Sequence, residues 1–121
     1  MARILVIDDE PQVRTMLKEI FEDEGYQVVT AADGEEGLKL YRYEPADLVV
    51  TDIVMPEKEG LATIRELRQI SPEVKIIAIS GGGRVVTRDF LRVAQAFGAK
   101  RVFSKPIATE ELLRAIAGLL E

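Results

Sequence analysis

The chain of 121 residues contains neither cysteine nor histidine. Without cysteine it can form no disulfide, no thiolate metal site and no cysteine nucleophile. Without histidine it lacks the side chain that usually carries protons near neutral pH, so its chemistry must use carboxylates, hydroxyls, lysine or a metal ion. The absence of cysteine suits a reducing compartment, and we expect a cytoplasmic protein.

Long hydrophobic runs are also missing. The apolar start at residues 1–7 is too short for a signal peptide, because Asp8, Asp9 and Glu10 end it at once. No stretch approaches the roughly 20 apolar residues of a membrane span. Twenty-one acidic and 16 basic residues give a net charge of −5. We therefore expect neither membrane insertion nor direct nucleic-acid binding.

Short apolar runs alternate with longer amphipathic ones. The short runs predict strands at Arg3–Ile7, Tyr26–Ala31, Asp47–Thr51, Val74–Ile79 and Arg101–Phe103. Helices are predicted from Pro11 to a stop at Gly25, after Asp33-Gly34, over Leu61–Ile70, over Val86–Phe97, and from a cap at Thr109 to Leu120. This (βα)5 alternation predicts one domain, residues 1–121, of the α/β class: a doubly wound, five-stranded parallel sheet between helices. No output domain is expected within it.

Polar side chains follow four of the five predicted strands. They are Asp8, Asp9 and Glu10 after the first, Asp52 at the third, Ser80 with three glycines after the fourth, and Lys105 after the fifth. Ligands of such sheets bind beyond the carboxyl ends of the strands, where the strand order reverses. If the order is 2-1-3-4-5, Asp8, Asp9 and Asp52 converge. Two carboxylates about 4 Å apart repel by roughly 4 kcal/mol at an effective dielectric near 20, and Mg²⁺ would neutralise them.

Each of these residues also has an ordinary structural interpretation. Asp9 or Glu10 could simply cap the helix at Pro11. Lys105 could be a solvated surface charge, and the three glycines a flexible turn. Their coincidence at the strand ends favours a common site instead.

Phosphoryl transfer would use most of this set. Asp52 would attack as an anion and form an acyl phosphate, which requires no general base. Mg²⁺ held by Asp9 and Asp52 would neutralise phosphoryl oxygens. Lys105, Ser80 and nearby backbone amides would contact the remaining oxygens.

Five motifs, in this order and spacing, carry a family resemblance. They are Ile4–Glu10, Asp47–Pro56 followed by Gly60, Ile76–Ser80, Gly98-Ala99 and Lys105-Pro106. With them the sequence resembles, over essentially its whole length, the receiver domain of bacterial two-component response regulators, of the single-domain CheY-like type. The resemblance implies a flavodoxin-like fold with strand order 2-1-3-4-5.

The resemblance also implies a metal site for Mg²⁺ or Mn²⁺. Asp52 matches the phosphoacceptor. Asp9 and Asp52 match direct metal ligands, Asp8 matches a ligand that acts through water, and Val54 matches the position whose backbone carbonyl completes the site.

The remaining site residues match as well. Ser80 matches the switch hydroxyl, Lys105 the phosphate-contacting lysine, and the peptide before Pro106 is expected to be cis. Glu10 has no ligand role in the family, and we interpret it as a charge at a helix N-terminus.

A receiver accepts its phosphoryl group from a histidine kinase, a histidine phosphotransfer protein or a small donor. It is no enzyme in the usual classification, although it catalyses its own phosphorylation and dephosphorylation. The implied target is a downstream protein or an output domain on another chain, reached by a monomer or a phosphorylation-dependent dimer. Two other arrangements stay open: an intermediate in a phosphorelay, and a fragment of a longer regulator. Candidate partner residues are Arg84, Arg88, Phe90, Arg92 and Arg101, although a solvated face is the plainer interpretation for most.

Two positions depart from the family pattern. Val102 occupies the place of the usual Tyr or Phe, and period-2 alternation directs Phe103 to the opposite face of the sheet. The connection after Ser80 is longer than usual and contains Gly81-Gly82-Gly83-Arg84. We expect this loop, with the start of the next helix, to be the moving element.

Two other classes of protein share the fold. A nucleotide-binding or flavodoxin-like module would carry a glycine-rich phosphate loop after the first strand, where this chain has three acids. A pseudo-receiver that serves only as an interaction platform would not need the complete set of acids and lysine.

Overall fold

A computed structural model describes residues 1–53, 60–80 and 88–121. Its strands are β1 (Arg3–Ile7), β2 (Gln27–Ala31), β3 (Leu48–Asp52), β4 (Ile76–Ser80) and β5 (Arg101–Ser104). Its helices are α1 (Pro11–Asp23), α2 (Gly34–Tyr43), α3 (Gly60–Ile70), α4 (Arg88–Phe97) and α5 (Thr109–Leu120). The predicted alternation is therefore confirmed. The glycine loop proposed as the moving element and Val54 lie outside the described residues.

The five strands form one parallel sheet in the order β2-β1-β3-β4-β5. This order confirms the α/β doubly wound fold implied by the resemblance. Every residue of β3 and β4 is buried, whereas the edge strands β2 and β5 begin with exposed residues. Central parallel strands are covered on both faces, so a continuous aliphatic sequence such as that of β4 is required there.

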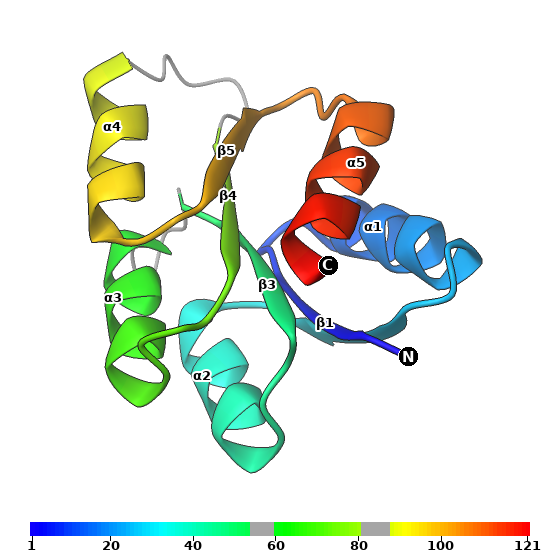
Figure 1. The fold of residues 1–121 in the computed structure, drawn as a ribbon, viewed down its shortest axis with the longest axis horizontal. Coiled ribbons are helices and arrows are strands. Elements are labelled where there is room, and N and C mark those ends of the chain that lie inside the picture. The colour runs from blue at the N-terminus through cyan, green and yellow to red at the C-terminus, as the bar shows by residue number, and fades with distance from the viewer. Residues whose placement is uncertain (54–59, 81–87) are drawn as a thin grey trace.

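The side chains of alternate strand residues point to opposite faces and form two cores. One core packs α2, α3 and α4 against the sheet through residues such as Leu38, Leu67 and Ala94. The other packs α1 and α5 through residues such as Phe21 and Ile116. Figure 1 shows this arrangement, with α1 and α5 on one side of the sheet and α2, α3 and α4 on the other.

Local signals at the helix ends explain most of the boundaries. Pro11 occupies the first turn of α1, and Gly25, after its end, has a φ of 90° that favours glycine. The Asp33 side chain accepts a hydrogen bond from the Glu36 amide and caps α2. The predicted cap at Thr109 is wrong: Ala108 holds the cap position without a side-chain hydrogen bond, and Thr109 is already helical.

The helices of the described part of the chain are too short or too polar to cross a lipid bilayer.

Candidate functional site

The register of the sheet brings four strand ends to one edge. Ile7 pairs with Thr51, Asp52 pairs with Ile79, and Ser80 pairs with Ser104. The first residues beyond the strands are therefore neighbours although they are far apart in sequence, and the predicted convergence of the polar strand ends is confirmed.

Backbone hydrogen bonds fix the main chain just beyond the strands. The Asp8 amide donates to the Ala31 carbonyl at 3.1 Å, and the Lys105 amide donates to the Ser80 carbonyl at 2.8 Å. The peptide between Lys105 and Pro106 is cis, as the resemblance implied. These contacts hold Asp8 and Lys105 in place, so their side chains approach a common point.

Asp8 is held by the turn into α1. Its side chain accepts a hydrogen bond from the Glu10 amide at 2.8 Å, and its backbone carbonyl accepts one from the Arg14 guanidinium at 2.7 Å. Nothing in the motifs had pointed to Arg14. Its place one turn into the helix that follows the acids was the available signal.

Lys105 joins the carboxylates of the site. Its ammonium donates a hydrogen bond to Oδ2 of Asp52 at 3.1 Å and lies 3.4 Å from Oδ2 of Asp8. It also donates to Oε1 of Glu10. The Lys105 side chain is only 11 % exposed, so the interpretation as a solvated surface charge is wrong.

Burial and charge shift the protonation of this cluster. Burial raises the pKa of Asp8 to about 6, and the Asp52 charge adds to the rise, while the Glu10 amide and Lys105 oppose it. Burial lowers the pKa of Lys105, but the hydrogen bond to Glu10 and the charges of Asp52 and Asp8 outweigh it and raise that pKa above its usual range. Lys105 is therefore a permanent cation at this site.

Asp8, Asp9, Glu10 and Asp52 could hold a metal ion, because one carboxylate oxygen of each lies within 4.8 Å of the others. Oδ2 of Asp8 is buried and forms no hydrogen bond within the described part of the chain. Its only described partner is the Lys105 ammonium, at ion-pair distance. An all-oxygen set with an orphaned buried carboxylate oxygen fits a hard divalent cation such as Mg²⁺.

Ser80 completes the site at the end of β4. The residue is fully buried, and its hydroxyl has no hydrogen-bond partner among residues 1–53, 60–80 and 88–121. A buried hydroxyl without a partner is costly and uncommon, and it is available to an incoming acceptor.

Gly60 packs directly on the end of β3. A Cβ atom there would lie 2.2 Å from the Cα of Ile53 and 2.4 Å from the carbonyl oxygen of Asp52. The start of α3 can approach the Asp52 main chain this closely only because residue 60 has no side chain.

Comparison with known proteins identifies this arrangement. The sequence model of the "response regulator receiver domain" family matches residues 4–117. The chain belongs to this family. It is 35 % identical to the chemotaxis protein CheY of Bacillus subtilis over 115 residues, which cover 94 % of this chain and 93 % of that protein. A receiver domain from Clostridium thermocellum has a similar solved structure, with a TM-score of 0.90, 33 % identity and coverage of 99 % of this chain and 94 % of that one.

Other relatives of this receiver are longer. The probable transcriptional regulator ycf27 of Cyanophora paradoxa is 39 % identical over 118 residues, which cover 98 % of this chain but 48 % of that protein. The chain thus spans about half the length of such relatives. Receiver domains interact with histidine kinases and with downstream effectors, and they are in general not classical enzymes.

The departure from the receiver pattern at Val102 is clear in the structure. Val102 is half-buried and packs against the core beneath α3 and α4, whereas Phe103 belongs to the core beneath α1 and α5. The prediction that these side chains face opposite sides of the sheet is confirmed. Of the candidate partner residues, Arg92 and Arg101 are exposed, and Arg101 lies over the Phe103 ring; for the other three no side chain is described.

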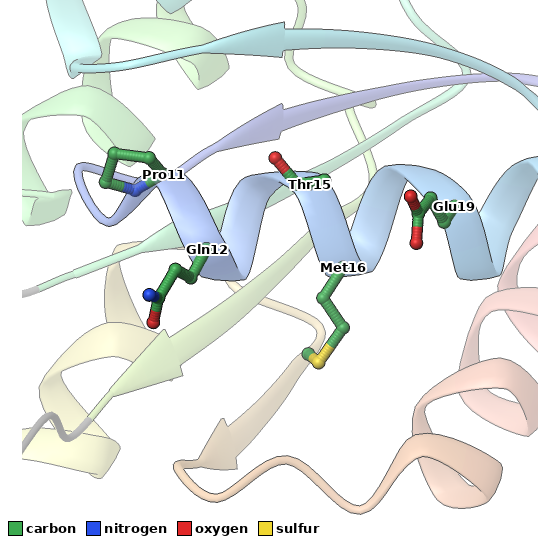
Figure 2. A pocket seen from close by; sticks show the side chains of 5 residues that line it. All are labelled: Pro11, Gln12, Thr15, Met16 and Glu19. Carbon is green, nitrogen blue, oxygen red and sulfur yellow. The ribbon is translucent and has the colours of Figure 1, made fainter.

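A shallow hollow of this receiver lies on α1 rather than over Asp52. It is lined by Pro11, Gln12, Thr15, Met16 and Glu19, and Figure 2 shows Gln12 and Met16 on the same side of the helix. Because a single helix lines it, the hollow lacks the converging polar groups of a small-molecule site.

Proposed function

We propose that residues 1–121 form one receiver domain in which Asp52 accepts a phosphoryl group in an Mg²⁺-dependent reaction. The observation that supports this most is the contact between the Lys105 ammonium and the buried Asp52 carboxylate. An ion pair that only stabilised the surface could stay exposed to solvent. A buried carboxylate beside a fixed cation suits transfer of an anionic group, because the cation can stabilise the negative charge of that group.

The chain's own residues account for each part of the reaction. A carboxylate oxygen of Asp52 attacks phosphorus, the bond to the donor oxygen or nitrogen breaks, and the donor leaves with that electron pair. Lys105 stabilises the negative charge on the transferred group. The Ser80 hydroxyl, which has no other partner in the described chain, donates to another phosphoryl oxygen.

Asp8, Asp9 and Asp52 would hold the metal ion, with the backbone carbonyl of Val54 as a further ligand; that carbonyl lies outside the described residues. Mg²⁺, or Mn²⁺ in its place, supplies positive charge that neutralises the carboxylates and phosphoryl oxygens together. Asp8 is suited to a contact through water because the Glu10 amide on Oδ1 orients the carboxylate, and Oδ2 accepts no described hydrogen bond.

The donor would be a cytoplasmic histidine kinase or histidine phosphotransfer protein, and the target a partner protein or an output domain on another chain. The conformational change that begins at Ser80 must be transmitted to that target without the usual aromatic residue, because Val102 occupies its place. Relatives such as the ycf27 regulator are about twice as long as this chain, which fits a receiver that belongs to a longer regulator as well.

Incubation with acetyl phosphate and Mg²⁺, followed by intact-mass measurement, tests the proposal. We expect one added phosphoryl group on the wild type, none when EDTA replaces Mg²⁺, and none on Asp52→Asn. A wild type that stays unmodified would favour an interaction platform of receiver fold instead.

A further inference from the structure

Glu10 contacts Lys105 across 95 positions of the sequence. It is the N-cap residue of α1, but its side chain makes no cap hydrogen bond to the helix. The interpretation of Glu10 as merely a helix N-terminal charge is therefore incomplete. Its carboxylate is directed to the ammonium of Lys105 instead.

The three carboxylates around Lys105 differ in exposure. The side chains of Asp8 and Asp52 are 1 % and 3 % exposed, whereas that of Glu10 is 50 % exposed. An ammonium has three N–H donors; that of Lys105 donates to Glu10 and Asp52 and lies at ion-pair distance from Asp8, so three carboxylates already surround it. Glu10 is the partner that returns most easily to water, because half of its side chain is already solvated.

We propose that Glu10 is a positioning residue that holds the Lys105 ammonium at the mouth of the site and competes for it with the incoming phosphoryl group. This inference rests on the proposed function of Asp52. In the resting protein Glu10 draws the ammonium toward solvent and away from the two buried carboxylates. When a phosphoryl oxygen arrives, it replaces Glu10 as an acceptor of the ammonium.

The proposal predicts effects of opposite sign on cations and anions. The Glu10 charge attracts Mg²⁺ directly and also weakens the hold of Lys105 on Asp8 and Asp52, so both contributions favour the metal. The same charge repels a phosphoryl analogue and occupies its ammonium, so both contributions oppose the anion. A merely structural role of Glu10 would change both affinities in the same direction.

Glu10→Gln removes the charge and keeps the shape, while Glu10→Asp keeps the charge. Glu19→Gln serves as the control, because this exposed acid lies nine positions along, about 13 Å away on α1. Amide NMR shifts report binding of Mg²⁺ alone and then of beryllofluoride at saturating Mg²⁺.

We expect Glu10→Gln to weaken Mg²⁺ binding roughly two- to fivefold and to tighten beryllofluoride binding by a similar factor. Glu10→Asp should restore Mg²⁺ binding toward the wild-type value, and Glu19→Gln should change neither affinity. Shifts of the same sign, or an unchanged beryllofluoride affinity in Glu10→Gln, would overturn the role of Glu10 alone. Failure of the wild type to bind beryllofluoride would overturn the proposed function and this inference with it.

Discussion

Lys105 and Asp52 are joined by a hydrogen bond of 3.1 Å, although 53 positions of sequence separate them. Their strands do not pair with each other, since β4 lies between β3 and β5. The contact exists because the register places both residues beyond the same edge of the sheet. Fold and site are therefore coupled, and the stability of the protein depends on the charges of the site.

Lys105→Met removes the cation that compensates the buried carboxylates. In EDTA we expect the free energy of unfolding, measured with urea, to fall by about 3 kcal/mol, because uncompensated buried charges are strongly destabilising. Mg²⁺ should restore more stability to this variant than to the wild type. Lys18→Met is the control: Lys18 forms an exposed pair with Glu22 on α1, and its loss should cost less than about 0.5 kcal/mol. Equal losses in the two variants would contradict the compensating role.

Asp8→Asn should stabilise the metal-free protein at neutral pH. Folding raises the pKa of Asp8 from 3.8 to about 6, so the folded state binds more protons in that window and the wild type loses stability as the pH rises through it. Asparagine carries no charge and can still accept the hydrogen bond from the Glu10 amide. The advantage should be absent near pH 4 and reach up to about 3 kcal/mol at pH 7.

Urea unfolding in EDTA at both pH values measures this advantage. A wild type that is more stable than Asp8→Asn at pH 7 would show that burial is not what dominates the Asp8 environment. Saturating Mg²⁺ should stabilise the wild type more than the variant, because the variant has lost a carboxylate of the metal site.

Gly60→Ala should disturb Asp52 through its main chain. The added methyl group would meet the backbone of Ile53 and the Asp52 carbonyl, and backbone atoms cannot move aside cheaply. We expect a loss of about 3 kcal/mol in unfolding free energy and slower phosphorylation. Gly118→Ala is the matched control: its methyl group meets nothing within 4 Å, and the helix should gain about 0.5–1 kcal/mol.

Substitutions at the N-termini of α2 and α5 should reduce the free energy of unfolding by different amounts. Asp33→Ala removes the hydrogen bond to the Glu36 amide and should cost about 1 kcal/mol. Thr109→Ala should cost less than about 0.5 kcal/mol, because Thr109 lies inside α5 and not at its cap. Thermal unfolding of both variants checks this, and a larger loss at Thr109 would contradict the assigned boundary.

The sequence predicted the alternation of elements well, because hydrophobic periods and the signals at Pro11, Gly25 and Asp33 are local. It failed at Thr109, where the choice between a cap and a first helical residue depends on backbone geometry. The acids and Lys105 were found as a set because strand ends of a parallel sheet share one edge.

The partners within that set could not be predicted. The contact of Glu10 with Lys105 depends on the direction in which the Glu10 side chain points from the turn before α1. The hydrogen bond from the Arg14 guanidinium to the Asp8 carbonyl depends on the angle at which α1 follows β1. Both relationships join residues whose local patterns have ordinary interpretations, so they required the three-dimensional structure.

The most direct test of the central claim is to locate the phosphoryl group. After reaction with acetyl phosphate and Mg²⁺, borohydride reduction converts an aspartyl phosphate to homoserine, and peptide mass spectrometry finds the converted residue. We predict conversion at Asp52 alone, and none in Asp52→Asn. Conversion at Asp8 or Asp9, or no conversion in a protein that binds Mg²⁺, would contradict the account.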